Sequence, residues 1–116
     1  MKIPFRWQAG RQQSGYEKMF LLCCPWVIKF DVYLLRFKPG SEIKPHIDPV
    51  TDARHYRLNL VLKHAKQGGA FTCDQPIYVS NRIKLFRPDV SEHSVTRVIE
   101  GTRYVFSIGW VRKAVA

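Results

Sequence analysis

The alternation of apolar and polar residues along this chain is typical of short β-strands. Segment 56–62 is the clearest case, because polar or small residues alternate strictly with leucines. No segment sustains the 3.6-residue period of a long amphipathic helix. The pattern therefore predicts an all-β, antiparallel fold. The two sides of segment 56–62 carry Arg57, Asn59 and Val61, and Leu58, Leu60 and Leu62, respectively.

Other segments are rich in β-branched, aromatic and aliphatic residues, and Gly, Pro and Asp separate them. The last two predicted strands would form a hairpin around Glu100-Gly101. Segment 63–69 is expected to be a turn. Residues 1–15 predict an irregular lead-in, and a short helix could begin at 11–16. The additional strands are expected at 16–24, 27–37, 42–48, 70–73, 77–79, 93–99 and 103–111.

Length and composition indicate one folded domain. The chain has 116 residues, of which 46% are hydrophobic, and it contains no low-complexity segment. Its most apolar stretch, 19–28, is too short for a membrane span and contains Pro25. Its three cysteines match neither a disulfide framework nor a zinc motif, so reduced thiols are expected. A cytoplasmic protein is therefore the expectation.

Three residues have the chemistry and spacing of a metal site. His46 and Asp48 lie two positions apart in a segment that reads as a strand, which places both side chains on one face. His93 lies far downstream and would be the third ligand. Two imidazole nitrogens and one carboxylate oxygen on one side of a metal leave the opposite positions open. That arrangement is typical of non-haem Fe(II) oxygenases.

The joint pattern resembles the 2-oxoglutarate- and Fe(II)-dependent dioxygenases, nearest to their prolyl-4-hydroxylase-like branch. Residues 35–48 match the family's strand, Pro-Gly turn and metal strand. Gly68-Gly69 matches its glycine pair before the next strand, and residues 92–103 match its distal block. The resemblance covers roughly residues 32–111. It implies that residues 1–116 form a single domain, a minimal double-stranded β-helix (jelly roll) with few or no helices.

The resemblance also implies a role for each site residue. His46, Asp48 and His93 would bind Fe(II), and 2-oxoglutarate would chelate the iron beside O2. Arg103 has the position of the family's cation, and a guanidinium can grip the distal carboxylate through two parallel hydrogen bonds. Ser107 lies on the same strand face and could add a hydroxyl bond. The implied reaction hydroxylates a substrate C–H bond while 2-oxoglutarate is decarboxylated to succinate.

Further candidates follow from the strand pattern. If the leucines of segment 56–62 pack outward, Arg57 and Asn59 line the pocket and could contact cosubstrate or substrate. The alternative is that both are solvent-facing polar residues. Phe37 stands where the family often has a tyrosine, so hydrogen bonds to the cosubstrate must come from elsewhere. His55 and His64 have no evident partner and are expected at the surface.

The charge balance points to polyanionic partners. The formal net charge is +10, from 19 Lys and Arg against 9 Asp and Glu. Such a field favours nucleic acid or another acidic partner, although a merely basic surface is an equal alternative. Because no helices are expected over the second sheet face, a weak homodimer through sheet-edge or sheet-face contact is also expected. Basic residues near the site segments are Lys44, Arg54, Lys84, Arg87 and Arg97.

Two other functions remain open at this stage. One is a jelly-roll binding module without catalysis, and the other is a cupin-type metalloenzyme that does not use 2-oxoglutarate. An intact His-Asp-His set together with Arg103 favours the dioxygenase over both. The sequence leaves the substrate open among a peptidyl proline, another protein side chain, a nucleobase and a small molecule.

Overall fold

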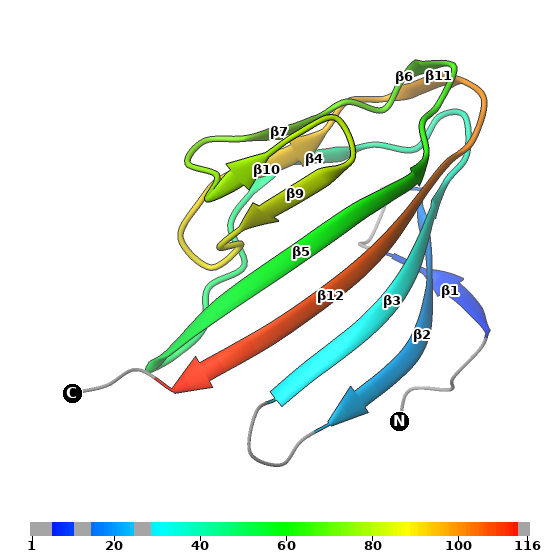
Figure 1. Ribbon diagram of the computed structural model, residues 1–116. Coiled ribbons are helices and arrows are strands. Elements are labelled where there is room, and N and C mark those ends of the chain that lie inside the picture. Colours follow the sequence, from blue (N-terminus) through cyan, green and yellow to red (C-terminus); the bar gives the residue numbers. More distant parts are fainter. Residues whose placement is uncertain (1–5, 11–14, 25–28, 114–116) are drawn as a thin grey trace.

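A computed structural model describes residues 6–10, 15–24 and 29–113, and these residues form strands and turns but no helix (Figure 1). None of them therefore belongs to a helix that could cross a membrane. The strands are β1 (Trp7–Ala9), β2 (Glu17–Cys24), β3 (Lys29–Phe37), β4 (Ile43–His46), β5 (Ala53–Lys63), β6 (Gln67–Gly68), β7 (Phe71–Cys73), β8 (Tyr78–Val79), β9 (Ile83–Phe86), β10 (His93–Val95), β11 (Val98–Glu100) and β12 (Arg103–Lys113).

The strands form three antiparallel sheets. The largest has seven strands in the order β1-β2-β3-β12-β5-β9-β8, with β12 between β3 and β5. A three-stranded sheet, β4-β10-β7, lies across one part of it, and the pair β11-β6 closes one end (Figure 1). This arrangement is the all-β jelly roll expected from the sequence.

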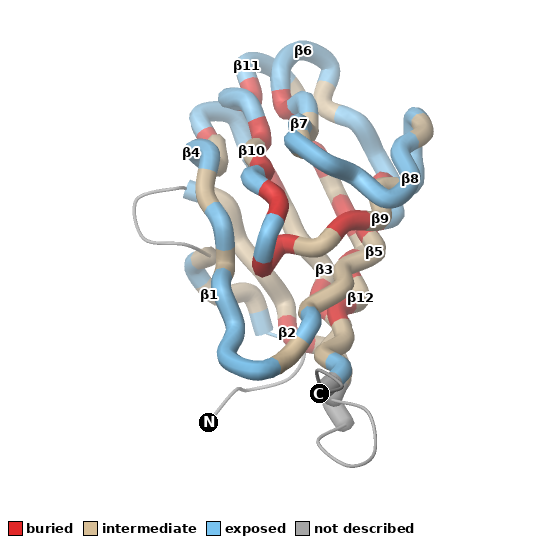
Figure 2. Tube along the Cα trace, turned by 90° about the vertical axis from the view of Figure 1, so that its left-hand side faces the viewer, coloured by how far each residue is buried: buried red, intermediate tan, exposed pale blue. Residues whose placement is uncertain are grey.

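The apolar core occupies only one end of the space between the sheets. Alternate residues of β12 face inward, and Figure 2 shows the buried positions gathered on strands that line the interior. Beyond the apolar end, the inner face of the large sheet carries polar residues, which leaves room for a site. The buried core cluster consists of Phe37, Val61, Val95, Val98 and Val105.

Three expectations about the backbone are wrong. The lead-in contains strand β1, which pairs with β2, and the turn at 63–69 contains strand β6. The segment 93–99 is not one strand and forms no hairpin with β12, because β10 pairs with β4 and β7 whereas β11 pairs with β6. The N–H of Thr96 donates to the carbonyl of Ala70, and the N–H of Val98 donates to the carbonyl of Ser41. These bonds fix the segment in which the chain passes from one sheet to the other. The proposed helix at 11–16 falls mostly outside the described residues.

Candidate metal centre and adjoining cavity

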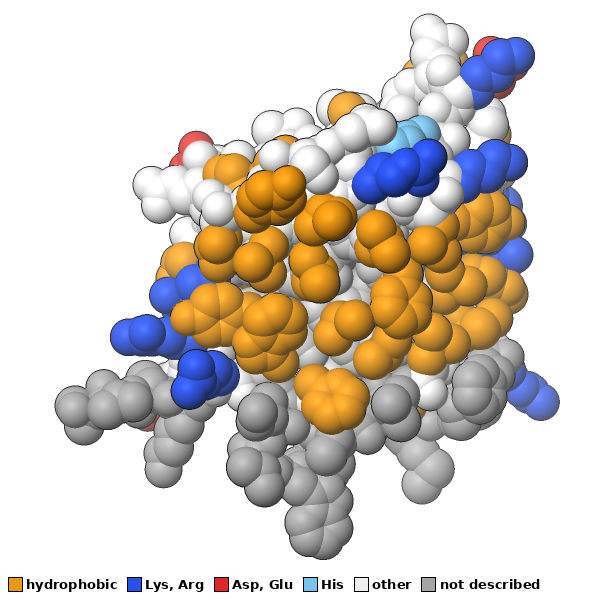
Figure 3. Space-filling model, in the orientation of Figure 1, with side chains coloured by type: hydrophobic (Ala, Val, Ile, Leu, Met, Phe, Trp, Pro, Cys, Tyr) orange, Lys and Arg blue, Asp and Glu red, His pale blue; other side chains and the backbone are white. Residues whose placement is uncertain are grey.

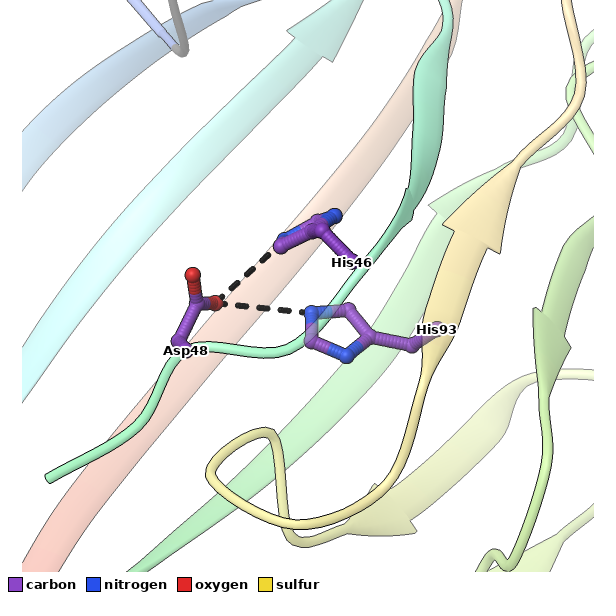
Figure 4. Close-up of side chains that lie close together, drawn as sticks. All are labelled: His46, Asp48 and His93. Atoms are coloured by element: carbon purple, nitrogen blue, oxygen red, sulfur yellow. Dashed lines mark ion pairs between the residues drawn. The ribbon is translucent and has the colours of Figure 1, made fainter.

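Two histidines from neighbouring strands and one aspartate converge at a single point (Figure 4). His46 on β4 and His93 on β10 are cross-strand partners, and their ring centres lie 4.2 Å apart. The Nε2 atoms of His46 and His93 lie 3.4 and 3.5 Å from the same oxygen of Asp48, Oδ2. The possible ligand atoms of the three residues all lie within 4.8 Å of one another. The structure thus brings together the three residues that the sequence singled out.

The hydrogen bonds of the two imidazoles suit metal binding. His46 Nδ1 lies 2.8 Å from the carbonyl of Lys44, and His93 Nδ1 lies 3.0 Å from the carbonyl of Ser91. A carbonyl only accepts, so each Nδ1 carries a hydrogen, and Nε2 is the nitrogen with which each imidazole would bind a metal. Neutral imidazole nitrogens beside a carboxylate are a donor set that fits Fe(II).

Asp48 is not on a strand, contrary to the sequence expectation. Strand β4 ends at His46, and Asp48 is positioned by a backbone hydrogen bond from its N–H to the carbonyl of Pro88, 2.7 Å long. Its side chain is 43% exposed, whereas His93 is buried. The three ligands therefore sit on one wall, with the aspartate at the more open side.

A cavity of about 330 Å³ lies between the small sheet and the inner face of the large sheet. This volume is within the range of small-molecule sites, which is about 300–1,000 Å³. Arg57 and Asn59 line it, while the alternate residues Leu60 and Leu62 point outward, 38% and 48% exposed. Arg57 and Asn59 therefore face the cavity and not the solvent. The other polar lining residues from the large sheet are Lys18, Asp31, Tyr33, His55, Arg103 and Ser107.

Arg103 is a buried cation beside the apolar core. It is 2% exposed, and its guanidinium carbon lies 4.9 Å from the centre of the Phe37 ring. No ion pair links it to any acidic side chain in the described part of the chain. Burial lowers the pKa of Arg103 to about 10, so the group is still protonated at neutral pH. A buried charge without a partner is unfavourable, and an anion in the cavity would relieve it.

The glycine pair of the sequence motif makes room for Arg103. Gly69 has a φ of +69°, and a Cβ atom there would lie 3.3 Å from Cδ of Arg103 and 3.0 Å from Cγ2 of Val98. At Gly68 a Cβ atom would lie 2.1 Å from the carbonyl oxygen of Arg97. Larger residues at either position would therefore disturb the packing over Arg103 and the pairing of β6 with β11.

Arg57, the second arginine of the cavity, has polar partners. It donates one hydrogen bond to Ser107 Oγ and another to Asp31 Oδ1, each 2.7 Å long. To reach Asp31 on β3, its side chain crosses β12 above Gly109, where a Cβ atom would lie 2.1 Å from Nη2. Ser107, expected to add a hydroxyl bond to the cosubstrate, accepts a hydrogen bond from Arg57 and lines the cavity. Sequence reasoning missed Asp31, although a carboxylate within an apolar strand was a usable signal.

The sequence predictions for His55 and His64 are correct for only one of the two residues. His55 was expected at the surface, which is wrong: it is half-buried, lines the cavity and lies 3.5 Å from Arg57 Nη2. Burial lowers the pKa of His55, so its imidazole is neutral at pH 7. His64 is exposed, as expected. Asn59 is buried, and its Oδ1 has no hydrogen-bond partner among the described residues.

Two tyrosines line the cavity together with Phe37. Tyr16 stacks on Phe37, with ring centres 5.0 Å apart and an interplanar angle of 16°. Tyr16 and Tyr33 both line the cavity. Two phenol rings therefore contribute to the cavity wall beside Phe37, which has no hydroxyl.

Comparison with known proteins identifies the fold. No protein-family model and no curated protein sequence matches this chain. A viral collagen prolyl hydroxylase from Paramecium bursaria Chlorella virus-1, solved with 2-oxoglutarate, is 20% identical, with a TM-score of 0.59 over 88% of this chain and 81% of that chain. A Pseudomonas putida prolyl-4-hydroxylase is 20% identical, with a TM-score of 0.56 over 75% of this chain and 53% of that chain.

KdgF from Halomonas sp. is 18% identical, with a TM-score of 0.57 over 90% of this chain and 84% of that chain. The fold is the jelly roll that this chain shares with these solved structures. At these identities the likeness concerns the fold. What this chain binds has to be argued from its own site residues.

Proposed function

We propose that this chain is an Fe(II)- and 2-oxoglutarate-dependent dioxygenase. One observation carries the proposal: a single cavity is lined both by the His46, Asp48 and His93 cluster and by Arg103, a buried cation without a counter-charge among the described residues. A ligand that binds a metal at one end and carries a carboxylate at the other satisfies both features. 2-Oxoglutarate is such a molecule.

Each part of the cavity has a distinct task in this scheme. His46, Asp48 and His93 hold iron on one wall and leave its other side open. Arg103 binds the distal carboxylate of 2-oxoglutarate and so fixes the direction in which the molecule lies. Bound iron would supply the activation of O2. Apolar side chains in the cavity wall help to exclude water. Phe71 and Phe86 are two of them, and their ring centres lie 4.9 Å apart.

The proposed reaction is balanced in atoms and electrons. One O2 and one 2-oxoglutarate are consumed, and one oxygen atom enters a substrate C–H bond to give an alcohol. The other oxygen atom enters succinate, and CO2 leaves. The four electrons that reduce O2 come in equal parts from 2-oxoglutarate and from the substrate.

The metal assignment is tested by removing one ligand. Asp48→Ala should abolish tight binding of Fe(II), because two remaining imidazoles hold a labile ferrous ion poorly. Succinate formation from 2-oxoglutarate should fall to background. Asp74→Ala, which removes an exposed carboxylate outside the cluster, is the matched control and should bind iron normally. Full iron occupancy in the Asp48→Ala variant would contradict the assignment.

The main rival is a cupin-type metalloenzyme that does not use 2-oxoglutarate. Arg103 argues against it, because that scheme leaves the buried cation without a partner. Calorimetry with 2-oxoglutarate on the metal-loaded protein separates the two. Metal binding without any 2-oxoglutarate binding would favour the rival, and binding without turnover on any substrate would favour a non-catalytic module.

The substrate is open among peptides, nucleic acid and small molecules. The net charge of +10 supports an anionic substrate, and nucleic acid is our preferred example. Oligonucleotide binding should then be measurable at about 50 mM salt and should fall steeply as salt rises. Absence of binding under that condition would favour peptide or small-molecule hydroxylation. We also propose a cytoplasmic location, since reducing conditions keep iron ferrous.

A further inference from the structure

The outer face of the seven-stranded sheet is apolar and open to solvent. Leu60 and Ile83 are each 38% exposed, Leu62 is 48% exposed and Tyr78 is 53% exposed. Phe106 continues the same face on β12, opposite Leu34 and Leu60. Figure 3 shows hydrophobic side chains gathered into one field across this face. An antiparallel sheet normally turns its polar side to water, so this one has the reverse arrangement.

The field is large enough for a stable interface. The seven strands of the sheet have 2 to 11 residues each and 48 residues in all. With about 3.3 Å per residue and 4.8 Å between strands, the outer face covers on the order of 800 Å². The largest apolar patch on a typical monomer is about 300–600 Å². About 800 Å² is also the area that each partner contributes to a standard protein–protein interface.

Positive charge borders the field in excess of the acids beside it. Arg87 pairs with Asp89, whereas Arg54 and Arg112 have no acidic partner among the described residues. Arg54 and Arg112 are direct cross-strand partners on the outer face, and both are exposed. Like charges in this position repel each other. Glu17 is the one acid among the described strand positions of this face, and Arg36 and Lys38 share it at 3.0 Å each. Figure 3 shows Lys and Arg side chains around the border of the field.

Tyr56 and Trp110 connect the arginine pair to the apolar field. Their rings stack with centres 5.7 Å apart, and Arg87 lies over the Tyr56 ring at 5.7 Å. Aliphatic residues dominate the centre of the field. Such a surface favours burial under another protein over the stacking of nucleobases, which requires exposed aromatic rings.

We propose that the outer face docks an amphipathic helix of another protein, with leucine-like residues toward the sheet and acidic residues along its flanks. Carboxylates on the helix would pair with Arg54 and Arg112 and so offset the repulsion between them. A helix of about 20 residues is about 30 Å long and matches the length of the central strands. A second copy of this chain fits less well, because two chains of net charge +10 would meet with the same positive border. This inference does not depend on the proposed catalytic function.

The probes are two fluorescent synthetic peptides with the same leucine positions. One has glutamate and the other lysine along both flanks of the helix. Fluorescence anisotropy should show that the glutamate peptide binds at least about tenfold more tightly. Its affinity should decrease as salt rises, because exposed charges are screened. The lysine peptide should bind weakly at every salt concentration.

A charge reversal tests the orientation. Arg54→Glu/Arg112→Glu changes two exposed side chains, so the fold should be retained, and the order of the two peptides should reverse. Leu60→Asp should weaken both peptides at least tenfold. Ile99→Asp is the matched control, because Ile99 is 56% exposed on β11, outside this sheet. It should leave both affinities unchanged.

Three results would overturn the proposal. The first is equal affinity for the two peptides, and the second is an order that stays the same in the charge-reversed variant. The third is a homodimer in sedimentation that tightens as salt rises and is lost in Leu60→Asp. That result would assign the face to a second copy, because added salt screens the repulsion between two basic chains.

Discussion

Two arginines on the inner face of the same sheet have opposite surroundings. Arg57 is bound to Asp31 and Ser107, while Arg103 is buried beside Phe37 with no acidic partner in the described residues. Both were candidates for binding a cosubstrate, Arg57 from the alternation of its strand and Arg103 from the resemblance to a known family. The difference shows that an inward position on a strand does not make a cation an anion receptor. A missing counter-charge is the feature that distinguishes the two.

The same difference makes the two ends of the cavity unequal in charge. Asp31 neutralises the charge of Arg57, whereas near the apolar core the cavity carries the positive charge of Arg103. A dicarboxylate would therefore place one carboxylate at Arg103. Its other end is then left for the metal cluster.

The largest expected effect separates the two arginines by ligand binding. Arg103→Met should weaken 2-oxoglutarate binding by about 2–4 kcal/mol, because it removes a buried charge-assisted pair. Arg57→Met should weaken it by less than about tenfold, since Arg57 is already neutralised by Asp31. Calorimetry with Mn(II) in place of iron measures both. A larger loss for Arg57→Met would reverse the assignment of the two residues.

The second effect concerns the stability of the ligand-free protein. Burial lowers the pKa of Arg103 from its ordinary value to about 10, a shift that corresponds to roughly 3 kcal/mol. Because the charged form is disfavoured in the folded state, this penalty is fully present below pH 10 and is lost as the pH rises further, toward the pKa of the unfolded chain. Arg103→Met should therefore raise the free energy of unfolding by up to about 3 kcal/mol at pH 7. Urea denaturation at pH 7 and 10.5 should show a smaller gain at the higher pH; a destabilised variant would contradict it.

The third effect is the coupling between Asp31 and Arg57. Their side chains are 30% and 17% exposed, so solvent screens the pair in part. Asp31→Asn and Arg57→Met should each reduce the free energy of unfolding by about 1–2 kcal/mol. The double variant should lose less than the sum, with a coupling of about 1 kcal/mol. Additive losses in urea denaturation would show that the pair contributes no stability of its own.

The smallest effect is expected at Gly109. A Cβ atom there would meet the end of the Arg57 side chain, which is flexible and can move aside. Gly109→Ala should thus cost about 1 kcal/mol or less by loosening the bond to Asp31. In an Arg57→Ala background the same replacement should cost almost nothing. A similar cost in both backgrounds would show that the loss arises from the backbone of β12.

Much of this molecule could be predicted from its sequence. Strict alternation around Arg57 and Asn59 predicted both the strand and the inward face, because the period of two is a local property. The convergence of His46, Asp48 and His93 was also predicted, through the resemblance to a known family. The structure confirms that the three residues cluster.

Other features depend on contacts that local patterns do not encode. Asp31 meets Arg57, 26 residues away, only because β3 and β5 both pair with β12 in a particular register. His55 lies in the cavity wall because it is on β5, two residues before Arg57. The predicted hairpin at Glu100-Gly101 failed because a turn signal does not specify which strands pair across it.

The position of β12 has a consequence for how the chain is made. In the seven-stranded sheet, β1, β2 and β3 form one group of neighbours, and β5, β9 and β8 form another. Among the described strands, β12 alone joins them, and it comes after all the others in the chain. Before residues 103–113 are synthesised, the two groups have no strand between them and Arg103 is absent. Joining of the two groups and arrival of the anion receptor are therefore one event, and it depends on contacts distant in sequence.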